Sequence, residues 1–150
     1  MSDRQNNNRE IVIGTDATWS NALVVTPNPA WAIIAGASFV VNAQDPANPT
    51  VVISRTFTLP ENRRIQTATL TIAVDNYASV LINGLFVVND NPQDNPLLYN
   101  PGRTFDITRF LNRGANNIVI VANNFGGPPT PTNPVGVAAR LNITTSRKKD

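Results

Sequence analysis

The sequence contains no cysteine and no histidine, and only 15% of its 150 residues are charged. Without cysteine no disulfide or zinc–thiolate site can form, and without histidine the commonest general base and metal ligand is missing. The serines therefore have no imidazole partner that could activate them as nucleophiles. There are only 10 acidic residues, most of them in expected turns, which does not suggest the flanking carboxylates of a glycosidase. These absences favour a protein that is not an enzyme.

Long apolar runs and clusters of charge are also scarce. No run is long enough to span a bilayer, and the first ten residues contain no apolar segment of a signal peptide. The net charge is +2, and positive charge gathers only at Arg147, Lys148 and Lys149. Because a short basic end is usually solvated, we expect neither a nucleic-acid partner nor membrane insertion. The compartment stays unknown, and the cell exterior or a spore surface, reached without a signal peptide, is one option.

What the chain does contain favours strands. Hydrophobic residues make up 41% of it, and 12 prolines and 8 glycines, with abundant Asn, Thr and Ser, divide it into short segments. No helical periodicity extends beyond about two turns, whereas Val, Ile and Thr recur in alternating runs. The length suits one domain with its own core. We predict a polar arm over residues 1–10, an all-β domain over 11–145 and a basic tail over 146–150.

Several segments are predicted as individual strands. Short strands are expected in IVIG, TDATWSNALVV, WAIIA and SFVV, which begin at Ile11, Thr15, Trp31 and Ser38. In residues 51–59, alternation places Val51, Ile53, Phe57 and Leu59 on one face. Residues 118–122 are apolar on both faces, which is typical of a central strand, and residues 137–144 alternate again.

The most regular stretch is LTIAVDNYASVLINGLFVVND, residues 70–90. Its alternation predicts one turn at Asp75-Asn76, after which the chain pairs back, and a type I′ turn at Asn83-Gly84. Two long turn-rich loops are expected over 89–103 and 126–134. Roughly eight to ten strands at this spacing predict a two-sheet antiparallel β-sandwich of the jelly-roll kind.

Four phrases occur in a familiar order: RTFTLP, ATLTIAVDNYASVLINGLFV, FDITRFLNRGANNIVIVANNFGGP and GVAARLNI. Together they resemble the galactose-binding-like jelly-roll domain of β-galactosidase-type glycoside hydrolases and of bacterial carbohydrate-binding modules. The resemblance extends from about Trp19 to Ile143. It implies loops at one end of the sandwich that bind sugar, although the same fold also serves as a mechanical module in larger enzymes.

A sugar site needs an aromatic face for stacking and planar polar groups for the hydroxyls. Tyr77 and Tyr99 fall at a turn and in a long loop, whereas Trp19 and Trp31 lie in apolar runs and are expected in the core. Asp75 and Asn76 precede Tyr77, although turn formation explains this pair equally well. Asn123 and Asn124 lie at the end of a later strand. The predicted carbohydrate-binding residues are Asp75, Asn76, Tyr77, Tyr99, Asn123 and Asn124.

The loops contain oxygen donors of the kind that could bind calcium. Asp45, Asp90 and Asp94 supply oxygen atoms of the kind that calcium prefers. Their spacing resembles no dedicated calcium loop, so we predict no metal site and no other cofactor.

A second interpretation makes the chain a self-assembling structural subunit of an extracellular or spore-surface fibre or coat. Ile11, Val12 and Ile13, behind the polar arm, would then extend the sheet of a neighbouring copy. Low charge and abundant Asn, Thr and Pro suit a resistant extracellular material. The expected partner is therefore either carbohydrate or further copies of the chain.

Overall fold

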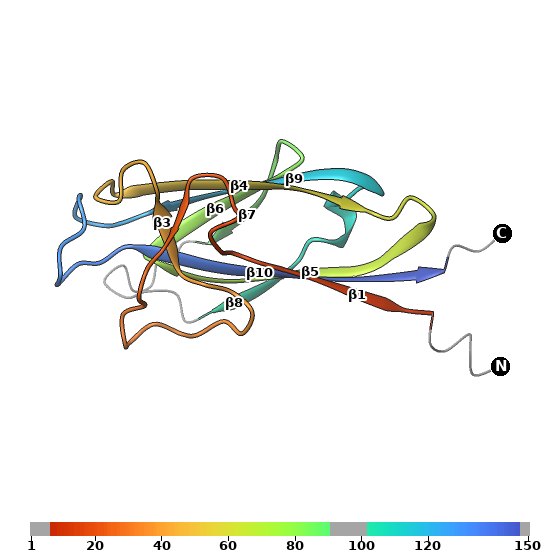
Figure 1. Cartoon of the computed structure of the whole chain (residues 1–150), viewed down its shortest axis with the longest axis horizontal. Helices are drawn as coiled ribbons and strands as arrows, with labels where there is room; N and C mark the ends of the chain where they lie inside the picture. Colours follow the sequence, from red (N-terminus) through yellow and green to blue (C-terminus); the bar gives the residue numbers. More distant parts are fainter. Residues whose placement is uncertain (1–6, 91–101, 148–150) are drawn as a thin grey trace.

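The computed structural model describes residues 7–90 and 102–147, and the chain there forms two antiparallel sheets packed face to face (Figure 1). The predicted all-β sandwich is thereby confirmed. No helix in these two segments is long and apolar enough to cross a membrane. The elements are β1 (Arg9–Gly14), β2 (Ala22–Val24), β3 (Val40–Asn42), β4 (Thr50–Leu59), β5 (Arg63–Asp75), β6 (Tyr77–Ile82), β7 (Leu85–Asp90), β8 (Arg103–Asp106), the 3₁₀ turn η1 (Thr108–Phe110), β9 (Gly114–Asn123) and β10 (Gly136–Arg147).

The two sheets differ in size. The six-stranded sheet has the order β2-β3-β10-β5-β8, and β1 also pairs with β10. β5 and β10 pair along their whole length, from Asp75 opposite Gly136 to Arg63 opposite Arg147. The four-stranded sheet has the order β4-β9-β6-β7. β9 is therefore central, as its two apolar faces predicted.

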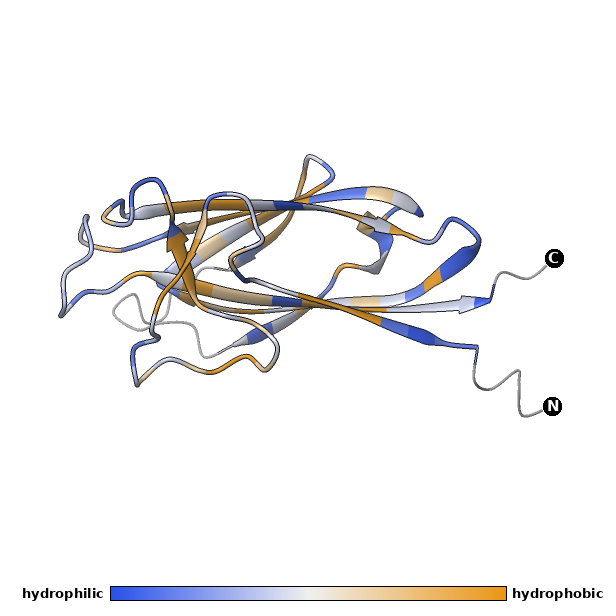
Figure 2. Ribbon diagram, viewed as in Figure 1, coloured by the Kyte–Doolittle hydropathy of each residue, from blue (hydrophilic) through white to orange (hydrophobic). Residues whose placement is uncertain are grey.

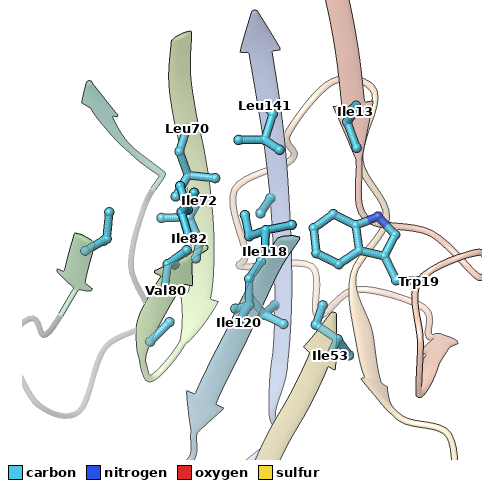
Figure 3. Packing of buried hydrophobic residues seen from close by; sticks show 14 of the residues in the cluster. Ile13, Trp19, Ile53, Leu70, Ile72, Val80, Ile82, Ile118, Ile120 and Leu141 are labelled. Carbon is cyan, nitrogen blue, oxygen red and sulfur yellow. The ribbon is translucent and has the colours of Figure 1, made fainter. Parts of the chain in front are cut away.

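The hydrophobic core lies between the sheets and is built from the inward-facing residues of alternate positions. Apolar residues occupy much of the middle of the strands, whereas most strand ends and most loops are polar (Figure 2). Trp19 closes one side of the core, and its Nε1 donates a 2.9 Å hydrogen bond to the carbonyl of Gly14. Burial of each large aliphatic side chain contributes about 1.5–3 kcal/mol. Figure 3 shows the packing of Ile13, Trp19, Ile53, Leu70, Ile72, Val80, Ile82, Ile118, Ile120 and Leu141.

The predicted turn at Asp75-Asn76 is a crossover between the sheets, so the expected first hairpin is wrong. β5 ends at Asp75 in the six-stranded sheet, and β6 begins at Tyr77 in the four-stranded sheet, with a cis peptide bond between Asp75 and Asn76. β5 pairs with β10 and β8, whereas β6 pairs with β9 and β7. Alternation cannot distinguish a hairpin within one sheet from a crossover between two sheets, because the inward residues of both sheets point into one core.

The second turn is confirmed. Asn83 and Gly84 have φ angles of 52° and 84°, as a type I′ turn requires, and β7 pairs back on β6. The Asn83 side chain donates to the Phe110 carbonyl and to Asn116 Oδ1, each at 3.0 Å, and accepts from the Asn117 amide at 2.9 Å. These bonds attach the turn to both η1 and β9.

Residues 31–35, predicted as a strand, belong to a loop on the outer face of the six-stranded sheet. Pro27 and Pro29 lack the amide hydrogens that a strand ladder needs, and Gly36 has a φ of 80°, outside the strand region. The loop instead forms a second apolar cluster with the outer face of β5 and β10. Its buried members are Trp31, Ile34, Phe39, Ala73 and Ala138.

The first strand pairs within its own chain. Ile11, Val12 and Ile13 lie opposite Ile143, Asn142 and Leu141 of β10. The prediction that these three residues join neighbouring copies is therefore not supported, because their strand is already part of the domain's own sheet. β1 begins at Arg9 and β10 ends at Arg147, so the sheet extends two residues into both the predicted arm and the predicted tail.

The candidate functional site at the loop end

The Asp75-Asn76 crossover lies at the end of the sandwich away from the start of β1 and the end of β10 (Figure 1). The loops from β3 to β4 and from β9 to β10 lie at this end too, which is termed the loop end. β7 ends with Asp90 opposite Ala78, and β8 begins with Arg103 opposite Ile72, so the strands that border residues 91–101 also terminate here. Of the predicted sugar-binding residues, Asp75, Asn76, Tyr77, Asn123 and Asn124 meet at this end, and Tyr99 lies outside the described residues.

Asp75 is buried and fastens the loop that contains Trp31. Its Oδ2 accepts a 2.9 Å hydrogen bond from Trp31 Nε1. The Trp31 ring lies against Gly136, where an added Cβ would approach ring atoms to 2.7 Å. Burial raises the pKa of the Asp75 carboxyl, while the bond from Trp31 opposes that rise. With only 7% of its surface exposed, Asp75 organises the loop end and does not present its carboxylate to a ligand.

Asn76 and Asn123 also have structural partners. The Asn76 amide donates to the carbonyl of Asn123 at 2.9 Å, and its Oδ1 accepts from the amide of Phe125 at 2.7 Å. Asn123 Oδ1 accepts from the hydroxyl of Thr50 at 2.8 Å. These bonds hold the start of β6 and the end of β9 together, next to β4.

Asn124 shapes the loop that follows β9. Its amide donates to the carbonyl of Pro49 at 2.8 Å, and its Nδ2 donates to the carbonyl of Gly127 at 3.0 Å. Its Oδ1 is buried and has no hydrogen-bond partner among the described residues. An unpaired buried acceptor costs about 1–3 kcal/mol, so a hydroxyl or water that reached this oxygen would stabilise the loop.

The half-exposed aromatic surface of the loop end is formed by Tyr77 and Phe125. Their ring centroids are 5.0 Å apart and the planes are tilted by 39°. The backbone of Phe125 is fixed on both sides, because its carbonyl also accepts from Asn133 Nδ2 at 2.7 Å. Neither Phe125 nor Asn133 is among the residues predicted from the sequence. The available signal was the position of Phe125 between the strand end and the Gly126-Gly127 turn.

Two hollows in the described surface lie at other places. One, of about 280 Å³, is lined by Thr18, Ser20, Ser54, Arg55 and Thr56. The other, of about 370 Å³, is lined by Asp106, Thr108 and Arg109. Neither lining includes an aromatic ring, which sugar stacking requires.

The Asp106 side chain binds Thr108, the first residue of η1. Its Oδ1 accepts from the Thr108 hydroxyl at 2.6 Å and from the Thr108 amide at 3.0 Å, and the bond from the hydroxyl is the larger cause of the lowered pKa of this carboxyl. Among residues 7–90 and 102–147, no three His, Cys, Asp or Glu residues gather into a group that could hold a metal ion. Of the three possible calcium donors, Asp45, Asp90 and Asp94, the last lies outside these residues.

No protein-family model matches the sequence, and no curated protein sequence matches it. Solved structures do match its fold. An α-L-rhamnosidase from Streptomyces avermitilis is similar over 88% of this chain, with 22% identity and a TM-score of 0.55. A β-glucuronidase from Ruminococcus gnavus is similar over 87%, with 12% identity and a TM-score of 0.53. A family 35 carbohydrate binding module from Clostridium thermocellum is similar over 89% of this chain and 97% of that module, with 16% identity and a TM-score of 0.47.

The chain spans only 14% of the rhamnosidase and 29% of the glucuronidase. Likeness at such low identity shows the fold alone. The two-sheet topology and these neighbours confirm the resemblance found in the sequence: the chain has the fold of the galactose-binding-like jelly-roll domain.

Proposed function

We propose that the protein is a non-catalytic module that binds carbohydrate at the loop end of the sandwich. The observation that carries this proposal is the Tyr77–Phe125 pair, a half-exposed aromatic surface held in place at the end where the loops gather. An aromatic ring offers an apolar face to the C–H groups of a pyranose, and the tyrosine hydroxyl offers a hydrogen bond to the sugar hydroxyls.

The rigidity of this surface supports the proposal. Asn76 and Asn133 bind the Phe125 backbone from two sides, so little conformational entropy is lost when a ligand stacks on the ring. In this arrangement Asp75, Asn76 and Asn123 position the aromatic pair and do not themselves contact sugar. Tyr99 stays a predicted contact, to be tested by substitution.

The acids of the loop end do not fit a glycosidase site. A glycosidase needs two carboxyl groups that flank the bond to be cleaved. Asp75 is buried and bonded to Trp31, which leaves Asp45 as the exposed carboxylate there among the side chains that the structure describes. The two solved enzymes that share this fold act on sugars, as their names state, and this chain corresponds to a small part of each. That relation fits a binding module.

The test is a glycan array followed by calorimetric titration with the soluble oligosaccharide that binds best. Tyr77→Ala and Phe125→Ala should each weaken binding by about 1–3 kcal/mol, as expected for removal of a stacking aromatic at a binding hot spot. Tyr99→Ala tests the third predicted aromatic in the same assay. The matched control is Phe86→Ala, which removes an exposed aromatic from the far end of the same sheet and should leave the affinity unchanged.

An array with no bound glycan would contradict the proposal. Binding that survives both Tyr77→Ala and Phe125→Ala would contradict the proposed site.

A further inference from the structure

The outer faces of the two sheets differ in charge and in whether a loop packs on them. The loop that contains Trp31 packs on the outer face of the six-stranded sheet. The same face carries a charged network, in which Arg140 Nε donates to Asn142 Oδ1 at 2.7 Å and Asn142 Nδ2 donates to Glu10 Oε1 at 2.9 Å. Arg140 Nη1 also donates to the carbonyl of Ala35 at 2.7 Å. The polar side chains of this network therefore have their hydrogen-bond partners within the chain.

The outer face of the four-stranded sheet is uncharged. Burial alternates along β4, β6 and β9 except at Arg55, which is partly exposed at an inward position. The outward positions are the even-numbered residues of 50–58 and the odd-numbered residues of 77–81 and 115–123. Every one of these is Thr, Ser, Asn, Ala, Val, Leu or Tyr. A solvated sheet face normally carries charged side chains, because these keep it soluble and prevent association.

An apolar row crosses this uncharged face from Val119 near the middle of β9 to Phe86 near the Asn83-Gly84 turn. Val119 lies opposite Leu81, and Leu81 lies opposite Phe86, while in the next row Val52 lies opposite Val121. Phe86 is 75% exposed and Val52 is 43% exposed. None of these five side chains belongs to either buried cluster, and the described part of the sandwich has no third layer over them (Figure 1).

We propose that the outer face of the four-stranded sheet is an interface between two copies of this chain, packed face to face. Two sheets pack well about 10 Å apart when apolar side chains interdigitate between them. A two-fold interface places the same patch on both sides, and a patch without charge meets its own copy without repulsion between like charges. A partner with a charged surface would find no opposite charges on this patch.

The size of the face also fits a second copy. Four strands about 4.8 Å apart and about eight residues long on average, at about 3.3 Å per residue, give a face of roughly 500 Å². Two such faces bury roughly 1,000 Å², which is about the smallest area expected of a specific interface. The row through Leu81 lies about 13 Å along β6 from Tyr77, so the loop-end aromatic pair stays at the margin of the interface. The proposal does not depend on carbohydrate binding.

The test is sedimentation equilibrium of the full chain over a concentration series. We expect a reversible monomer–dimer equilibrium. Val119→Lys and Phe86→Asp should each raise the dimer dissociation constant about tenfold or more, because a two-fold interface carries each new charge twice. The matched control is Thr144→Lys, which places the same charge on an outward position of β10, the central strand of the other sheet, and should leave the equilibrium unchanged.

A chain that stays monomeric at every concentration would overturn the proposal and leave the face to a different partner. So would a dimer that both Val119→Lys and Phe86→Asp leave intact, since it would use another surface. Thermal melting verifies that each variant is folded. If Val119→Lys does not fold, Phe86→Asp still decides, because the Phe86 side chain contributes to neither buried cluster.

Discussion

The indole of Trp31 and the carboxylate of Asp75 are joined by a hydrogen bond of 2.9 Å across 44 residues of sequence. The bond ties the loop on the outer face of the six-stranded sheet to the place where the chain crosses to the other sheet. Phe39 packs on the Trp31 ring with centroids 4.7 Å apart. Since the crossover also sets the start of β6, this bond positions Tyr77 indirectly.

Trp31→Phe should lower the free energy of unfolding by at least about 1.5–3 kcal/mol, because a buried charged acceptor loses its donor and the smaller ring fills less space. Urea denaturation measures this change. The control is Phe39→Leu, which alters the packing of the same cluster but keeps the hydrogen bond, and should cost less.

A double substitution separates the bond from the packing. In the Trp31→Phe background, Asp75→Asn should restore part of the stability at pH 7, because it removes the unpaired buried charge. If Asp75→Asn makes Trp31→Phe less stable, the hydrogen bond is not the main source of the loss.

The stability of the protein should depend on the protonation of Asp75. Burial raises the pKa of this carboxyl above its ordinary value of 3.8, so between the unfolded and folded pKa values the native state binds more protons than the unfolded state. The stabilising contribution of the protonated form is complete below the unfolded value and is lost as pH rises through the folded value. Wild type should therefore lose stability relative to Asp75→Asn as pH rises from about 3.8, and the difference should then level off.

Comparison with Asp75→Asn is needed because other carboxyls act in the opposite direction. Bonds from the side chains of Thr18 and Thr108 lower the pKa values of Asp16 and Asp106, so their contributions are present at higher pH and are lost in acid. These contributions cancel in the difference between the two proteins, measured by urea denaturation at several pH values. A difference that does not change with pH would show that Asp75 is not titrating in the folded protein with a raised pKa.

The sequence predicted those parts of the fold that are decided locally. The inward residues of β4 and β10 follow from alternation, and the Asn83-Gly84 turn follows from the need for two positive φ angles. The crossover at Asp75-Asn76 depends on which distant strand each half pairs with, and alternation carries no such information. The loop of residues 31–35 has the apolar residues of a strand, yet they cover the outside of a sheet.

For the candidate site, the chemistry of single residues was a poor guide to their roles. Asp75, Asn76 and Asn123 have the groups that a sugar site uses, but their partners lie within the chain. Those partners come from segments that are remote in sequence, so only the folded chain reveals that the groups are occupied. Tyr77 was selected for its place at a turn, and Phe125 was missed because its position beside Tyr77 arises from the pairing of β6 with β9.

Truncation of the N-terminus should distinguish the contribution of the arm to stability from that of β1. Deletion of residues 1–10 removes Arg9 and Glu10 from β1, together with the Asn7 carbonyl that accepts from Arg63. No residue of the core is lost, so the sandwich should still fold, with a loss of about 1–2 kcal/mol for a few exposed or partly buried hydrogen bonds. The same deletion should leave the dimer dissociation constant unchanged, since β1 lies in the six-stranded sheet.

Deletion of residues 1–14 should cost about 2.5–6 kcal/mol more. It removes Ile13, which is 6% exposed, and the burial of this side chain contributes about 1.5–3 kcal/mol to the free energy of unfolding. It also removes the Gly14 carbonyl that accepts from Trp19 Nε1, and the buried donor left unpaired costs about 1–3 kcal/mol. Urea denaturation of the two truncated chains measures the step between them. Equal stability of the two would show that β1 contributes nothing to the core, and an unfolded product of the shorter deletion would show that the arm is part of the domain.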